Sequence, residues 1–180
     1  MPYASSIGSL VRAVGRVLLL GALVAASIEP AFAITMANDP HGFHQIPWGV
    51  PLTDIPELVV TRTNSHTTDY EFRDRAPLYA DVPVESVLLS TVDAQFARVT
   101  VRYRGAQTHS QVLQFLERSY GMIERLPGQM MRGLNQQYTW RGTDTEISLT
   151  YEANRDRGFV FIESRNLAPR FQDRISDTAE

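Results

Sequence analysis

The sequence predicts an α+β domain, an antiparallel sheet with one main helix packed on one of its faces. Two observations favour this class. A hairpin pattern precedes a helix pattern, and three strand patterns separated by short turns follow it. The resulting order is β-β-α-β-β-β, and the N-terminal part of the domain can add further edge strands. Residues 34–165 form the predicted domain, in which the helix covers the apolar side of the sheet.

A secretory signal peptide is predicted over residues 1–33. Arg12 and Arg16 give it a basic start, residues 17–28 form an uncharged apolar run, and Pro30 ends that run. A membrane-spanning helix needs roughly 20 apolar residues, and this run is shorter. We therefore expect an exported protein, periplasmic or secreted, without a membrane span in the mature chain.

The signal cleavage site is predicted between Ala33 and Ile34. Small residues occupy the −3 and −1 positions of this site, as signal cleavage requires. A cut after Ala26, with Val24 at the −3 position, is the alternative that the pattern leaves open. Either cut leaves a chain long enough to form one domain with its own core.

The composition restricts the chemistry that this chain can perform. It contains no cysteine, which excludes thiol catalysis, thiolate metal sites and a lipid anchor on cysteine. The formal net charge is −3 and lysine is absent, so arginine supplies the permanent positive charge of the side chains. A mildly acidic chain is not typical of nucleic-acid binding, and we expect no nucleic-acid partner.

Two short strand patterns precede the predicted hairpin. Residues 58–61 are rich in β-branched side chains, and Tyr70 and Phe72 alternate with charged neighbours. Residues 74–81, with Pro77 near their centre, are predicted to form a loop.

The hairpin is predicted from residues 84–90 and 96–104, joined by a turn at residues 92–95. Apolar and polar side chains alternate with a period of two along the second strand, which therefore has a buried and a wet face. The predicted buried face carries Val99, Val101 and Tyr103, and the wet face carries Arg98, Thr100, Arg102 and Arg104.

A helix is predicted over residues 109–120. Thr108 followed by Gln111 fits a capping box at its start, and Gly121 stands where a left-handed C-cap belongs. The apolar side chains recur at helical spacing. They are Val112, Leu113, Phe115, Leu116 and Tyr120.

Three strands are predicted after the helix, over residues 136–141, 145–152 and 158–164. Two turns that contain glycine separate them, and apolar residues alternate along the first two strands. Residues 166–180 are polar and are predicted to form a tail that frays or lies on the surface.

The chain resembles a class of small secreted or envelope-associated bacterial proteins of unassigned activity. The resemblance is carried by the pattern F-x-x-I-P-W-G at 43–49, the pair Tyr120-Gly121, Y-x-W at 138–140 and T-x-I-x-L-x-Y at 145–151. These are aromatic and turn positions, which are typical of a fold. The resemblance implies no catalytic residue.

Arg98, Arg102 and Arg104 are the first candidate binding residues. Three guanidinium groups on one strand face suit an anionic partner, such as a carboxylate, a phosphate or an acidic envelope polymer. The alternative is a solvent-facing surface neutralised by cross-strand pairs, in which Glu85 lies near Arg102.

Met122, Met130 and Met131 are the second candidate group, on a loop predicted over residues 122–135. Long loops in compact domains are often binding elements, and methionine provides adaptable apolar surface for protein contacts. The alternative is that these side chains cover a sheet edge or the end of the helix.

Two further patterns have structural explanations that we favour. His41 and His44, with Asp39 nearby, are spaced as weak candidate ligands of a divalent metal, but a solvated loop explains them as well. Four aromatic residues suit a sugar-binding groove, but aromatic side chains also dominate small cores. These four are Trp48, Tyr138, Trp140 and Tyr151. We expect no metal and no cofactor.

The leading prediction is an exported, non-enzymatic module that binds or inhibits another envelope component, either a protein or an anionic component. The sequence lacks the motifs of nucleophile elbows, phosphate-binding loops, zinc proteases and dinucleotide sites. The second alternative is an exported hydrolase with a site assembled from dispersed Asp, Glu, His and Arg side chains. A structural envelope module is the third. The sequence does not predict the oligomeric state.

Overall fold

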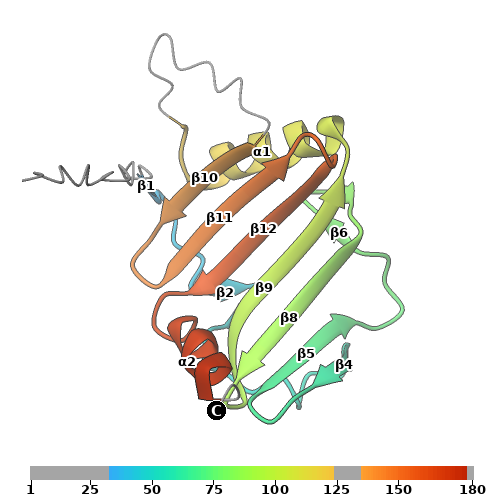
Figure 1. The fold of residues 1–180 in the computed structure, drawn as a ribbon, viewed down its shortest axis with the longest axis vertical. Helices are drawn as coiled ribbons and strands as arrows, with labels where there is room; N and C mark the ends of the chain where they lie inside the picture. Colours follow the sequence, from blue (N-terminus) through green and yellow to red (C-terminus); the bar gives the residue numbers. More distant parts are fainter. Residues whose placement is uncertain (1–32, 124–134, 178–180) are drawn as a thin grey trace, which may run out of the picture. The chain divides into compact units, whose positions relative to one another are not determined.

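The computed structural model describes residues 33–123 and 135–177 (Figure 1). This part of the chain is mostly sheet and carries a main helix, so the predicted α+β class is confirmed. The predicted signal peptide lies outside the described residues except for Ala33, and it stays a prediction. The alternative cut after Ala26 also lies outside them.

One eight-stranded sheet forms the centre of the fold, in the order β1-β10-β11-β12-β9-β8-β5-β4. Neighbouring strands are antiparallel except for β1, which runs parallel to β10. The strands are β1 (Ala33–Thr35), β4 (Leu58–Thr63), β5 (Thr67–Phe72), β8 (Ser86–Val92), β9 (Gln95–Arg104), β10 (Asn135–Arg141), β11 (Thr145–Glu152) and β12 (Arg157–Ser164). The predicted cleavage bond between Ala33 and Ile34 lies within β1.

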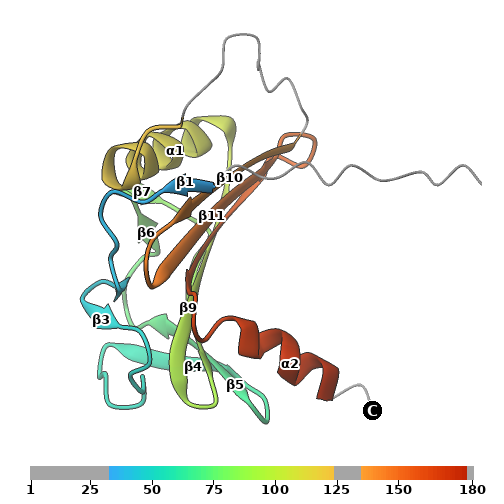
Figure 2. The same cartoon turned by 90° about the vertical axis from the view of Figure 1, so that its left-hand side faces the viewer.

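Two short hairpins and two helices complete the described fold. One hairpin pairs β2 (Gly42–Phe43) with β3 (Ile46–Pro47), and the other pairs β6 (Leu78–Tyr79) with β7 (Val82–Pro83). The helices are α1 (Ala106–Tyr120) and α2 (Pro169–Asp177). Figure 2 shows α1 and the short hairpins on one side of the sheet and α2 on the other. We call these sides the inner face, under α1, and the outer face.

The β8–β9 hairpin has the predicted buried face, but its predicted wet face is only partly exposed, since Thr100 is 8% exposed and Arg98 is half-buried. Val99, Val101 and Tyr103 are buried on the inner face, whereas Arg102 and Arg104 are exposed on the outer face. The inner side chains join a single large apolar cluster with residues of β8, β11, β12 and α1. Burial of this cluster is the main source of stability for the fold.

Helix α1 begins and ends differently from the prediction. It starts at Ala106, and its N-cap is Gly105, which makes no side-chain cap hydrogen bond. The predicted capping box is therefore wrong, because Thr108 lies inside the first turn. Gly121 has φ 126° and ψ 143°, a positive-φ conformation that favours glycine but differs from the predicted left-handed helical C-cap. This conformation brings the Gly121 carbonyl to the indole N–H of Trp140, which donates a hydrogen bond of 2.8 Å to it.

Helix α2 lies within the segment predicted to be a polar tail. Leu167 and Phe171 are buried and pack against Val92 and Ala97. Pro169 is the first residue of the helix, where its missing N–H leaves no hydrogen bond unmade. The sequence pattern missed this helix because few apolar side chains mark its buried side.

Candidate functional site

The three predicted arginines lie on β9, but their partners differ. Arg98 forms an ion pair with Glu163, and its guanidinium carbon lies 4.2 Å from the ring centroid of Phe171 in α2. Arg104 forms an ion pair with Glu85. The predicted proximity of Glu85 to Arg102 is confirmed, because the backbone N–H of Glu85 donates a hydrogen bond of 2.7 Å to the Arg102 carbonyl. The Glu85 carboxylate, however, forms its ion pair with Arg104, two positions further along the same face.

Arg102 is exposed, and no acidic side chain pairs with it within residues 33–123 and 135–177. In the β9–β12 register, Phe159 lies opposite Arg102 and Arg157 lies opposite Arg104. Residues directly opposite each other point to the same face of an antiparallel pair. Arg157 is likewise exposed and without an acidic partner in the described part of the chain.

These side chains surround a shallow hollow of about 330 Å³ on the outer face. We call it the arginine hollow; its lining residues are Glu85, Arg102, Tyr103, Arg157, Gly158 and Phe159. Phe161 continues the apolar line along β12, with its ring centroid 6.4 Å from that of Phe159 and the two ring planes 8° from parallel. Arg157 was not among the predicted site residues, because it falls in the turn predicted between residues 152 and 158.

A larger cavity of about 750 Å³ lies on the inner face. We call it the inner cavity. The apolar part of its lining comes from the β2 strand, β5, the β6–β7 hairpin, β8, α1 and β12. The larger apolar side chains include Phe43, Phe72, Leu78, Val87, Phe115 and Ile162.

His44 and Arg75 lie together at the Phe72 side of the inner cavity. The His44 ring meets the Phe72 ring edge-on at 5.9 Å, and the Arg75 guanidinium carbon lies 5.6 Å from the same ring centroid. Burial and the nearby charge of Arg75 lower the pKa of His44. The imidazole is therefore neutral at physiological pH, and it retains one N–H donor.

Tyr79 also lines the inner cavity, and its side chain is 5% exposed. Its hydroxyl is buried and finds no hydrogen-bond partner among the described residues. Burial, with smaller contributions from Tyr120 and Tyr103, raises the pKa of Tyr79 well above its usual value. Tyr79 is therefore a neutral phenol whose hydroxyl group has lost water without gaining a partner.

Replacing Tyr79 with phenylalanine is expected to raise the free energy of unfolding by about 1 kcal/mol, because an unsatisfied buried hydroxyl is removed without leaving a cavity. Thermal unfolding of the variant and the parent measures the change. Tyr103→Phe is the matched control, since its hydroxyl makes a 2.8 Å hydrogen bond with Nδ1 of His109 and its loss should lower the melting temperature. A lower melting temperature for Tyr79→Phe contradicts the prediction.

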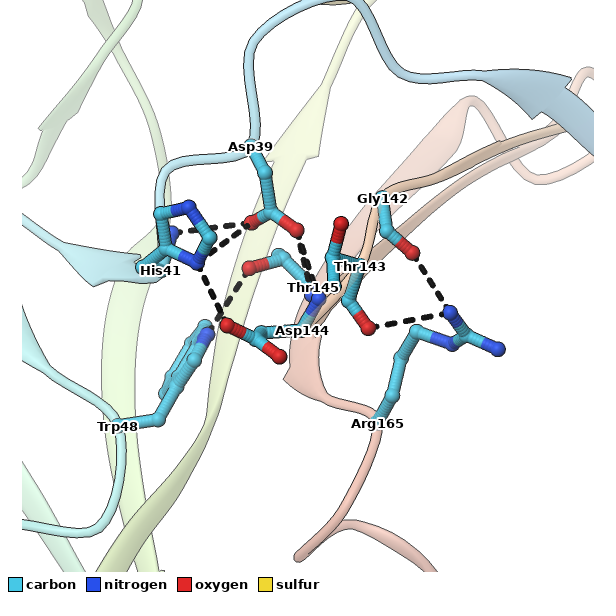
Figure 3. Close-up of polar contacts among 8 residues, drawn as sticks. All are labelled: Asp39, His41, Trp48, Gly142, Thr143, Asp144, Thr145 and Arg165. Atoms are coloured by element: carbon cyan, nitrogen blue, oxygen red, sulfur yellow. Dashed lines mark hydrogen bonds and ion pairs between the residues drawn. The ribbon is translucent and has the colours of Figure 1, made fainter.

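Asp39 anchors the turn between β10 and β11 (Figure 3). Its Oδ2 accepts hydrogen bonds from the backbone N–H groups of Asp144 at 2.7 Å and Thr145 at 3.2 Å. Its Oδ1 accepts the N–H of His41 at 3.0 Å. Burial raises the pKa of Asp39, but hydrogen bonds from Thr145, Asp144 and His41 outweigh it and lower the pKa to about 2.

The same turn is held from two further sides in Figure 3. The indole N–H of Trp48 donates to Oγ1 of Thr145 at 2.9 Å. The Arg165 guanidinium donates to the carbonyl groups of Gly142 at 2.6 Å and Thr143 at 3.1 Å. These contacts join the N-terminal segment and the end of β12 to one turn, so the cluster has a structural role.

The two predicted metal-binding histidines have different surroundings. Nδ1 of His41 lies 2.7 Å from Oδ2 of Asp144, whereas the His44 ring contacts Phe43 and Phe72. Among the described residues, no group of three or more acidic or histidine side chains is placed to hold a metal ion. The structure therefore does not bring His41 and His44 together as a site.

The remaining sequence candidates are divided by the structure. Met122 is 67% exposed, whereas Met130 and Met131 lie outside the described residues. Trp140 and Tyr151 are buried core residues, and Trp48 and Tyr138 are half-buried against that core. This placement agrees with the prediction that the four aromatic residues belong to the core and do not line a sugar-binding groove.

Comparison with models of known protein families, with curated proteins and with solved structures found no match. Within the described residues, no helix has both the length and the apolar character needed to cross a bilayer.

Proposed function

We propose that this protein is an exported, non-enzymatic binding module of the cell envelope and that the arginine hollow binds an anionic partner. The observation that supports it most directly is that Arg102 and Arg157 lack acidic partners in the described part of the chain. Glu85 also lines the hollow, but it is paired with Arg104. Two unneutralised guanidinium groups beside one hollow suit a carboxylate or phosphate.

The aromatic side chain of the hollow adds a second element of recognition. Phe159 lies opposite Arg102 and is followed by Phe161 along the same strand face. An anionic group next to an apolar ring favours a partner that presents negative charge on a carbon framework rather than a free inorganic ion. An acidic envelope polymer or an acidic segment of an envelope protein has this chemistry.

A hydrolase remains the alternative, and the inner cavity is the place where its site would have to lie. Such a site needs two ionisable groups that converge on the substrate. His44, Glu71, Arg75, Asp81 and Glu85 line this cavity, but no hydrogen bond or ion pair joins any two of these five described residues. We favour the binding module because Arg102 and Arg157 beside the arginine hollow lack acidic partners in the described part of the chain.

Replacing both Arg102 and Arg157 with serine is expected to abolish retention on a dextran sulfate column at low salt. The parent protein should be retained despite its acidic net charge and should elute as added salt screens the contact. Elution volume against salt concentration is the measurement.

Arg62→Ser with Arg73→Ser is the matched control, since it removes the same charge from exposed positions outside the hollow. This control should elute like the parent. Circular dichroism should show all three proteins folded, because exposed substitutions change stability by about 0.5 kcal/mol or less. Equal elution of the two double variants rules out the arginine hollow as the binding surface.

A further inference from the structure

The inner cavity has the size and lining of a site for a small apolar molecule. Its volume of about 750 Å³ lies in the range of ligand pockets, which is roughly 300–1,000 Å³. Leu78 in its lining is 49% exposed, although large apolar side chains gain stability when they are covered. The cavity lies on the inner face, and Glu85 is the one described residue that its lining shares with the arginine hollow.

Arg75 is the cationic side chain of this cavity, whose described lining also includes the acidic residues Glu71, Asp81 and Glu85. No acidic side chain pairs with it within the described residues. Glu85 in the same lining is paired with Arg104. Glu71 and Asp81 also line the cavity, and neither forms an ion pair with Arg75 in the described part of the chain.

His44 adds a hydrogen-bond donor beside Arg75. Both side chains contact the ring of Phe72, so the guanidinium and the imidazole lie at the same end of the apolar lining. A guanidinium and an imidazole N–H next to an apolar cavity complement one carboxylate attached to an apolar chain.

We propose that the inner cavity binds a fatty carboxylate, with its carboxylate at Arg75 and His44 and its chain against Phe72, Leu78 and Phe115. A peptide of similar size fits less well, because each of its amide groups needs a hydrogen-bond partner and the lining is mainly aliphatic and aromatic. A neutral or cationic chain leaves Arg75 without a partner.

Isothermal titration of the purified exported protein with dodecanoate, below its micellar concentration, tests the proposal. We expect saturable binding to one site. Dodecanol and dodecyltrimethylammonium, which have the same chain without the negative charge, should bind at least about tenfold more weakly, as the loss of a charge-assisted contact implies. Equal affinity for dodecanoate and dodecanol overturns the proposal.

Arg75→Gln provides the second arm. It should weaken dodecanoate binding by about tenfold or more while leaving dodecanol binding unchanged. Arg73→Gln is the matched control, since this neighbouring exposed arginine does not line the cavity. Unchanged dodecanoate affinity in Arg75→Gln contradicts the assignment. The double variant of Arg102 and Arg157 should bind dodecanoate normally, so failure at one site is distinguishable from failure at the other.

Discussion

Replacing Gly158 with alanine should lower the free energy of unfolding by about 2–4 kcal/mol, because the added methyl group overpacks the core and disturbs a buried hydrogen bond. A Cβ at this position would overlap the ring of Tyr103, which is 1% exposed. The ring cannot simply move aside, since its hydroxyl is hydrogen-bonded to His109 at 2.8 Å. The His109 ring in turn stacks on Tyr151, with centroids 4.3 Å apart. Urea unfolding measures the loss.

A double-mutant cycle shows whether the overlap with Tyr103 is the cause. Tyr103→Ala alone should be strongly destabilising, because it leaves a cavity in the core. In that background, however, Gly158→Ala should cost much less than it does in the parent, since the ring that it overlaps is gone. Additive losses of stability would mean that Gly158 matters for another reason, such as its backbone.

The sheet was predictable where side chains alternate without interruption. The sequence pattern and the structure agree on the bounds of β11, Thr145–Glu152, in which every second side chain is buried. The buried inner side of β9 also follows from its alternation, although Thr100 on the opposite side is buried as well. Both strands have a buried face that recurs at every second residue. An apolar pattern with a period of two therefore predicts both the strand and the side chains that face the core.

The candidate sites were less predictable, because contacts between distant segments create them. The salt bridge of Glu85 depends on which of two arginines on the same face lies within reach, and alternation alone does not distinguish Arg102 from Arg104. Arg157 joins the arginine hollow only through the β9–β12 register. The lining of the inner cavity combines His44, Arg75 and residues of α1. These residues are far apart in the sequence, and no local pattern predicts that they lie together.

Asp39 is the clearest case of a long-range contact that no local pattern reveals, and its replacement with alanine should lower the free energy of unfolding by about 2–4 kcal/mol. Its carboxylate accepts the N–H groups of Asp144 and Thr145, more than 100 positions away along the chain. Removal of the acceptor leaves these donors without their charged partner, and hydrogen bonds to charged groups contribute about 1.5–3 kcal/mol each. Asp54→Ala, at an exposed carboxylate outside this turn, is the matched control.

The pH dependence separates this contact from a general effect of the mutation. In the folded protein the pKa of Asp39 is about 2, below its ordinary value of 3.8. A carboxylate with a lowered pKa stabilises the fold above its ordinary pKa, and this contribution is lost as the pH falls toward the folded value. The stability difference between parent and Asp39→Ala should therefore be constant above about pH 5 and should shrink as the pH falls from 4 to 2. Urea unfolding at each pH measures the difference, and a difference that stays constant down to pH 2 contradicts the role of the charged carboxylate.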